Sequence, residues 1–405
     1  MIQLSSLLNK LAADKGIRQA LLLFAGMRLL LSLWAAIAMG AVPVCGQPDE
    51  LLRPYLGETP LTSGLSGALL GPWQRFDGQH YIHIARHGYV EEAESVFPPL
   101  YPLAIRLLTA ILGSSTSGYL LSAIIVSNLA AVSVFILLHR LTAQLLDDET
   151  AGRAILYLAL FPTSFFLFAP YSESLFLLLV LGAFWAAGRD QFWIAGILGL
   201  LASLTRLTGW ILIVPLLYAY WEQRGKPRTI FDSEGSNLSF EALAPLLPAL
   251  GFLSFLLWRW WAGLPSLGEI YQRYWYQSAG IPGTDLISAS STLFFGGTAR
   301  GNERIALSLD LAAAVLLIIS AALAYRRLGK RYGLYSLMLL FFMLLPTSEV
   351  KPLYSFSRYA LAFFPTFILL AVAGRRPAIN RLIVYGSLLL LLYASAQFFL
   401  WGWIA

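Results

Sequence analysis

The sequence has 405 residues, of which 58% are hydrophobic and only 12% are charged, and its mean hydropathy is +0.68. Soluble globular proteins carry about twice this charged fraction, so the composition excludes an ordinary soluble globule. The net charge of +6 lies mostly at the ends of apolar segments, where basic residues set membrane topology, so it does not indicate nucleic-acid binding. The single cysteine, Cys45, excludes an internal disulfide.

Apolar segments that approach the length needed to cross a bilayer follow one another along the chain. Because helices satisfy their own backbone hydrogen bonds in lipid, each segment is expected to be a helix, and the protein an all-α polytopic membrane protein. The first segment is expected to be a retained helix rather than a cleaved signal. About eleven spans are expected. In chain order they are 20–42, 119–141, 154–168, 175–187, 192–204, 207–220, 243–262, 305–325, 334–345, 359–373 and 382–403.

The segment 101–112 is apolar but contains Arg106, and its length of about twelve residues is short for a span. If it lies along the membrane surface as an amphipathic helix, the basic loops all fall on one side, which is the cytoplasmic side by the positive-inside rule. We therefore predict that 43–118 is one long extracytoplasmic catalytic loop with interfacial helices. The whole chain, 1–405, is expected to form a single integral membrane domain.

The long loop holds the most polar passage of the chain, 73–89, which contains three of the four histidines. Its ionisable side chains fall within an arc of about 120° on a predicted helix: Asp77, His80, His83 and His87. Such a face suits general-base chemistry, since a carboxylate or a neutral imidazole can take a proton from a hydroxyl. Two alternatives are a metal site at His80, His83 and His87, and a helix whose polar face only meets water and headgroups.

Charged residues beside apolar segments are costly and therefore suggest function. Arg206 and Arg358 are expected on the extracytoplasmic side, where a planar guanidinium can pair with a phosphate at two points or simply snorkel to the surface. Glu173 either stabilises the first turn of a helix capped by Ser172 or binds substrate hydroxyls. Asp310 is expected to cap the start of its span.

Several motifs resemble those of the PIG-V mannosyltransferases. The first-loop signature is carried by Phe76-Asp-Gly-Gln-His-Tyr-Ile-His-Ile-Ala-Arg-His-Gly-Tyr89 and by Phe97-Pro-Pro-Leu-Tyr-Pro102. Further matches occur in the order of the family: Phe161-Pro-Thr-Ser-Phe165, Tyr171-Ser-Glu-Ser-Leu-Phe176, Thr205-Arg-Leu-Thr-Gly209, Ser357-Arg-Tyr359 and Phe364-Pro365. Together they span most of the chain and are more specific than any one of them alone.

The resemblance implies a GT-C type membrane glycosyltransferase that takes a sugar, typically mannose, from a polyprenyl phosphate on the extracytoplasmic side. Asp77 matches the acid assigned as catalytic in such enzymes. It would act as base on the acceptor hydroxyl in an inverting reaction, while Arg206 and Arg358 hold the lipid phosphate. The remaining residues expected to bind substrate are Arg75, His80, Tyr81 and Glu173. No cofactor is expected, with a metal ion at the histidines as the secondary alternative.

A site outside the cytoplasm has no nucleotide sugars to use, and the sequence accordingly lacks GxGxxG, P-loop and DxD motifs. The expected acceptor is a lipid-linked or surface glycan, and the expected location is the plasma membrane of a bacterium. Two other functions stay open. A transporter or flippase for lipid-linked saccharides would carry ionisable residues near the bilayer midplane and broken helices in paired halves. A non-catalytic subunit of a transferase would show no activity alone.

Overall fold

The computed structural model describes residues 14–42, 49, 53–224, 240–295, 301–348 and 350–404. Within these ranges the regular structure is helical except for two short strands, β1 (Ser278–Ala279) and β2 (Pro346–Thr347), which pair antiparallel. The predicted all-α class is therefore confirmed. Cys45 and most of the predicted segment before the first span lie outside the described residues.

The chain forms two compact units, each built from separate stretches of sequence. Unit 1 contains Met1–Arg86, Ala104–Ser174 and Thr366–Ile404. Unit 2 contains His87–Leu103 and Leu175–Pro365. That the two work as one transferase domain stays a prediction.

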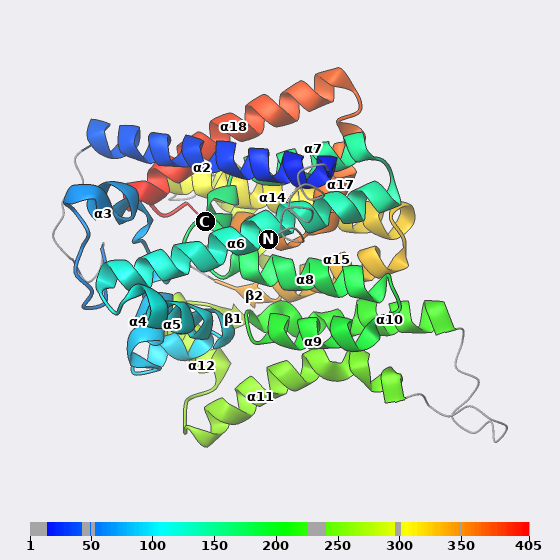
Figure 1. The fold of residues 1–405 in the computed structure, drawn as a ribbon, viewed down its shortest axis with the longest axis horizontal. Helices are drawn as coiled ribbons and strands as arrows, with labels where there is room; N and C mark the ends of the chain where they lie inside the picture. The colour runs from blue at the N-terminus through cyan, green and yellow to red at the C-terminus, as the bar shows by residue number, and fades with distance from the viewer. Residues whose placement is uncertain are drawn as a thin grey trace, which may run out of the picture. The chain divides into compact units, whose positions relative to one another are not determined.

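The frame of unit 1 consists of four helices, three of which begin at side-chain caps. Asp14, Ser115 and Asp147 each accept a backbone N–H from the first turn of the helix that follows. The helix α2 packs against α6, α7 and α18, and α2 and α18 run side by side in Figure 1. The helices of the frame are α2 (Lys15–Ala41), α6 (Thr116–Leu145), α7 (Asp148–Leu160) and α18 (Pro377–Phe399). The shorter elements are α3 (Gly64–Leu69), η1 (Gly71–Trp73), α4 (Asp77–His87), α5 (Leu100–Leu112), η3 (Ser164–Leu167) and α17 (Phe364–Ala373), some of which reach into unit 2.

Unit 2 is built around two helix pairs, α9 with α11 and α14 with α15. The first pair approaches closely at Gly251, where an added Cβ would lie 2.5 Å from the carbonyl oxygen of Leu200. The α-helices of this unit are α8 (Glu173–Ala187), α9 (Phe192–Ser203), α10 (Ile213–Arg224), α11 (Leu247–Trp261), α12 (Leu267–Trp275), α13 (Thr284–Phe294), α14 (Asn302–Arg327), α15 (Lys330–Leu344) and α16 (Phe356–Tyr359). The first two residues of α8, Glu173 and Ser174, still belong to unit 1. Short 3-10 turns are η2 (Glu92–Val96), η4 (Leu207–Leu212), η5 (Phe240–Leu246) and η6 (Ala360–Ala362).

Several helices are apolar on their exposed faces as well as on their buried ones. In α2 the side chains of Leu22 and Leu29 are 67% and 61% exposed, while Leu31 is fully buried. A helix that is apolar all round belongs in a hydrocarbon environment. Five described helices are long and apolar enough to cross a bilayer: Lys15–Ala41, Thr116–Leu145, Phe240–Trp261, Asn302–Arg327 and Pro377–Phe399. The chain is therefore an integral membrane protein.

The expected count of about eleven spans is not confirmed. A sixth span results if Phe356–Ala362 and Phe364–Ala373, which meet at 85°, count as one. The other expected spans are shorter or interrupted. The segment 154–168 is one example, since α7 ends at Leu160 and Pro162 follows. Proline lacks the N–H that a helix needs and disfavours helical geometry in the residue before it, and Phe161 is accordingly extended (φ −54°, ψ 141°).

The segment predicted to lie along the membrane surface forms α5, a helix of 13 residues. Leu103, Leu107 and Ile111 are 49%, 64% and 80% exposed, and they recur every four residues on one face. Tyr101 and Ile105 are fully buried on the opposite face. An exposed apolar stripe on a helix too short to span supports the predicted interfacial position.

Gly209 of η4 lies against the end of α9, where an added Cβ would stand 2.3 Å from the backbone nitrogen of Ser203. Gly209→Ala is expected to destabilise the protein by about 1–3 kcal/mol, because main-chain atoms cannot move aside as a side-chain tip can. The measurement is the unfolding temperature in detergent. Gly268→Ala in α12 meets nothing within 4 Å and should leave that temperature unchanged or slightly raised. Equal values for the two variants would contradict the close approach.

Candidate active site

The polar passage of the first loop forms α4, and its two faces are those predicted from the sequence. Asp77, His80 and His83 are half-buried and His87 is exposed. On the other side, Tyr81, Ile82 and Ala85 are 5%, 1% and 1% exposed. The ionisable face is therefore accessible while the apolar face is fixed in the protein.

The backbone at the start of α4 is held in place from several directions. Phe76 has a φ of 47°, in the left-handed region that is rare for an aromatic residue. Its ring packs against those of Trp401 and Trp403, at centroid distances of 5.2 and 5.0 Å. The backbone N–H of Asp77 donates to Tyr171 Oη at 3.2 Å. The main chain at Asp77 is thus fixed where the proposed base begins its helix.

A second predicted motif, Tyr171 to Glu173, lies against this helix within unit 1. Ser172 Oγ is 2.8 Å from Tyr81 Oη, and the carbonyl oxygen of Tyr171 accepts the Ser127 hydroxyl at 2.9 Å. Glu173, the first residue of α8, is only 5% exposed. Burying a carboxylate is costly, so its position next to this contact suggests a role beyond solubility. The structure therefore brings two motifs together that are far apart in the sequence.

Arg75 binds main-chain carbonyls through its guanidinium. Its guanidinium is 2% exposed and donates to the carbonyl oxygen of Phe399 through Nε at 3.0 Å and Nη2 at 2.8 Å. Nη1 donates to the carbonyls of Gly71 and Gln74 at 2.8 and 3.0 Å. Burial lowers the pKa of Arg75 to about 10, which leaves it protonated at neutral pH. These donors link a carbonyl at the end of α18 to carbonyls at the two ends of η1, so the geometry favours a structural role over the expected substrate contact.

Arg206 and Arg358 come together in unit 2, on the ring of Tyr359. The guanidinium carbons of Arg206 and Arg358 lie 5.2 and 5.1 Å from the ring centre. Arg358 is 5% exposed and its Nη2 donates to Tyr359 Oη at 3.3 Å. Cations are attracted to an aromatic face, and two of them on one ring create a positive potential that favours an anion. The sequence predicted both arginines but not the ring that joins them.

The later part of the first loop is bound to the same unit. The N–H of Leu100, at the start of α5, donates to the carbonyl of Leu204, two residues before Arg206, at 2.9 Å. Arg273 forms an ion pair with Glu92 at 2.8 Å, and Arg259 donates to the carbonyl of Ser95. The sequence gives no signal of these roles, because the partners of Arg259 and Arg273 lie more than 150 residues away along the chain.

Asp310 does not cap the start of its span, as the sequence suggested. It lies well inside α14, which begins at Asn302, and Oδ1 accepts the backbone N–H of Ser357 at 2.7 Å. The expectation was wrong because Asp310 lies eight residues after the start of α14, beyond the first turn whose free N–H groups a cap would serve.

No group of three or more His, Cys, Asp or Glu side chains within the described ranges could hold a metal ion. The alternative of a metal bound by His80, His83 and His87 therefore has no geometric support in this part of the chain. That the protein works without a cofactor stays a prediction.

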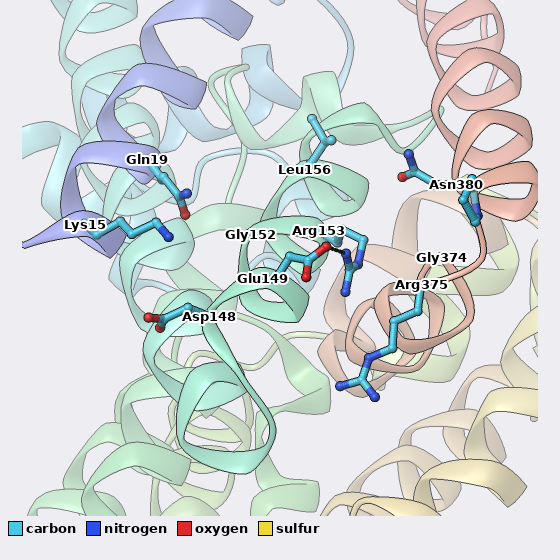
Figure 2. A pocket seen from close by; sticks show the side chains of 11 residues that line it. Lys15, Gln19, Asp148, Glu149, Gly152, Arg153, Leu156, Gly374, Arg375 and Asn380 are labelled. Atoms are coloured by element: carbon cyan, nitrogen blue, oxygen red, sulfur yellow. Dashed lines mark hydrogen bonds and ion pairs between the residues drawn. The ribbon is translucent and has the colours of Figure 1, made fainter.

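A polar cavity of about 450 Å³ lies elsewhere in unit 1 (Figure 2). Its charged lining includes Lys15, Asp148 and the ion pair between Arg153 and Glu149 at 2.5 Å. Lys15 comes from the first turn of α2, and Asp148 and Glu149 come from the first turn of α7. The lining combines three basic side chains, of Lys15, Arg153 and Arg375, with two acidic ones, of Asp148 and Glu149.

The helix α6 reaches the surroundings of α4 near its start and this cavity near its end. Near its start, Thr116 donates to Glu58 at 2.8 Å, and Glu58 also binds Arg86 of α4. Near its end, His139 Nε2 is 3.1 Å from Gln19 Oε1, which lines the cavity. Between residues 116 and 139 a helix rises about 35 Å, which exceeds the hydrocarbon thickness of a bilayer.

The family model for mannosyltransferase (PIG-V) matches residues 47–219. The resemblance to the PIG-V mannosyltransferases is confirmed. The matched range contains Asp77, Glu173 and Arg206, and it ends before Arg358.

Similar curated proteins carry the name GPI alpha-1,6-mannosyltransferase 2. The one from Rattus norvegicus is 33% identical over 42% of this chain and 36% of its own length. The one from Cricetulus griseus is 30% identical over 58% of this chain and 47% of its own length. The chain thus spans about a third to a half of the length of these relatives.

Two solved structures are similar over most of the chain. ArnT from Cupriavidus metallidurans, bound to undecaprenyl phosphate, is 13% identical with a TM-score of 0.47, over 94% of this chain and 76% of that one. The Archaeoglobus fulgidus oligosaccharyltransferase, tethered with an acceptor peptide, is 14% identical with a TM-score of 0.41, over 93% and 55%. Since both TM-scores lie below 0.5, the GT-C type of the bundle is part of the proposal below.

Arg75→Lys is expected to lower the unfolding temperature in detergent, with a loss of about 1–3 kcal/mol. An ammonium group lacks the planar fork that serves three carbonyls at once. Arg106→Lys in α5 provides the control, because Arg106 is exposed and its replacement should leave stability unchanged. If both variants unfold at the wild-type temperature, Arg75 does not stabilise the end of α18.

Proposed function

We propose that the chain is a GT-C type glycosyltransferase, with 1–405 acting as one transferase domain. It would move a hexose, mannose in the first instance, from a polyprenyl phosphate to a lipid-linked or surface glycan. The observation that carries this proposal is Asp77, whose backbone is fixed at the start of an accessible polar helix face, within the range that matches the PIG-V model. The names of the similar proteins support the reaction class.

Asp77 is proposed as the general base. Its carboxylate takes the proton of the acceptor hydroxyl while the oxygen attacks the anomeric carbon of the donor sugar. The bond from that carbon to the phosphate oxygen breaks, and the polyprenyl phosphate leaves with the bonding electrons. Attack from the face opposite the leaving group inverts the anomeric configuration.

Arg206 and Arg358 are proposed to bind the donor phosphate. Negative charge builds up on its oxygen as the sugar leaves, and two guanidinium groups on one aromatic ring supply donors that are in place beforehand. His80, one turn after Asp77 on the same face, and the buried Glu173 are proposed to bind sugar hydroxyls. Tyr81 would contribute through its contact with Ser172.

The charge at the two ends of unit 1 supports an extracytoplasmic site. Lys15, Arg153 and Arg375 line the cavity at the end of α6 that lies away from α4. Loops rich in lysine and arginine stay in the cytoplasm, which would place α4 on the other side of the membrane. A lipid-linked donor suits that side because it carries its activated sugar in the membrane itself. Location in a bacterial plasma membrane stays a prediction.

Asp77→Asn is expected to lower transfer by about 10²–10⁴-fold, because the amide cannot take the proton. The assay uses the purified protein in liposomes with labelled polyprenyl phosphate mannose and a glycolipid extract as acceptor. Asp148→Asn is the matched control: it makes the same change at an exposed position in the cavity lining. Asp77→Asn that folds and transfers at the control rate would remove the proposed role.

The same liposomes separate the alternatives. A flippase would carry the labelled lipid across the bilayer without making a glycosidic bond. A non-catalytic subunit would give neither result until its partners are added.

Transfer by the wild-type protein is expected to survive dialysis against EDTA, because the proposed chemistry uses only side chains of the chain. The measurement is the initial transfer rate before and after chelation, with an EDTA-treated sample returned to excess Mg²⁺ or Mn²⁺ as control. A rate that falls on chelation and recovers with metal would restore the site at His80, His83 and His87 as the better interpretation.

A further inference from the structure

The turn that carries Arg358 is held by two buried acids that the proposed reaction does not use. Asp310 and Asp285 are each 6% exposed, and both belong to unit 2. Asp310 comes from α14 and Asp285 from α13, so the turn is held from two different elements.

Asp310 binds the main chain next to Arg358. Its Oδ1 accepts the N–H of Ser357 at 2.7 Å, and α14 packs against α16. The segment around Asp310 has a mean hydropathy of 2.4, where an acid is costly and needs partners. The N–H of Ser357 that Asp310 binds belongs to the residue directly before Arg358.

Asp285 binds the preceding part of the same turn. Its carboxylate accepts the N–H of Leu353 at 3.0 Å, and both of its oxygens lie 3.3 Å from the nitrogen of Ser348. Burial raises the pKa of Asp285, and the N–H groups of Leu353 and Ser348 act against that rise. One acid therefore ties two points of the turn together.

The backbone between these anchors is strained. Leu353 and Ser355 have φ values of 57° and 59°, in the left-handed region that costs a non-glycine residue about 1–3 kcal/mol. At the other end, Thr347 of β2 pairs with Ser278 of β1. Such a conformation persists only where the surroundings over-determine it, and the acids and the strand pair supply that restraint.

We propose that Asp310 is a positioning residue for Arg358, and that Asp285 secures the turn leading to it. The two acids hold Arg358 beside Tyr359 and Arg206 before the donor phosphate arrives, so binding does not have to order the turn. This inference rests on the proposed function, in which Arg358 binds that phosphate. The inference adds that Asp310 and Asp285 raise the affinity for the lipid phosphate by positioning Arg358, although a carboxylate by itself repels a phosphate.

The test is a double-mutant cycle on the binding of undecaprenyl phosphate in detergent. Native mass spectrometry measures the binding. The variants are Asp310→Asn, Arg358→Lys and both together. Asparagine keeps an oxygen acceptor of similar shape but loses the charge, so Asp310→Asn should weaken binding roughly tenfold, the effect of one charge-assisted hydrogen bond. Because Asp310 acts through Arg358, the double variant should bind no more weakly than Arg358→Lys alone.

Two controls accompany the cycle. Ser336→Ala removes a buried hydroxyl from α15, whose hydrogen bond goes to Tyr332 of the same helix at 3.0 Å, and it should bind like the wild type. Undecaprenol, which lacks the phosphate, should bind all variants equally. A loss that appears with undecaprenol as well would show general damage and overturn the positioning role.

The outcomes distinguish the two proposals. If Arg358→Lys binds like the wild type, the phosphate role of Arg358 fails. If Arg358→Lys weakens binding but a folded Asp310→Asn variant does not, the positioning role fails. It also fails if the affinity loss of the double variant equals the product of the losses of the two single variants. If Asp310→Asn does not fold, Asp285→Asn takes its place in the cycle, since its acid lies outside the long apolar helices and is expected to act through Arg358 in the same way.

Discussion

Four buried charged side chains of this apolar chain bind main-chain hydrogen-bonding groups. Arg75 binds carbonyls at the end of α18, Arg259 binds the carbonyl of Ser95, and Asp285 and Asp310 bind N–H groups of the Arg358 turn. Taking a charge out of water without such partners would cost far more than most single contacts contribute. Irregular backbone has the same need, because turns in an apolar setting leave polar groups that must be satisfied. One set of contacts therefore meets both demands.

This pairing explains where the irregular parts of the fold occur. The turn before Asp77 and the turn before Arg358 each contain non-glycine residues with positive φ, at Phe76 in one and at Leu353 and Ser355 in the other. Aromatic rings hold the first, and buried acids hold the second. Residues proposed for chemistry thus follow directly on strained backbone that is fixed by its surroundings, which is a common property of active sites.

The sequence predicted what depends on periodicity and residue type. The face of α4 with Asp77 and His80 follows from the 3.6-residue repeat, and the short α5 follows from its length and from the distribution of basic residues. It failed where partners come from distant segments. No local pattern around Arg75 indicates that its carbonyl partner is Phe399, and none around Asp310 indicates that it binds the N–H of Ser357. The shared ring of Tyr359 joins Arg206 and Arg358 across a separation that no local pattern reports.

The helix α6 connects the two surfaces of unit 1 as a single rigid element. Its contacts with Glu58 near one end and with Gln19 near the other are polar, and in a bilayer they would be best accommodated at the level of the lipid headgroups. A straight helix cannot shorten, so a thinner bilayer would have to thicken around it or the unit would have to tilt. Tilting would tip α4 relative to the membrane plane. The thickness of the surrounding lipid would then set the angle at which the polar face of α4 meets a donor that arrives within the bilayer.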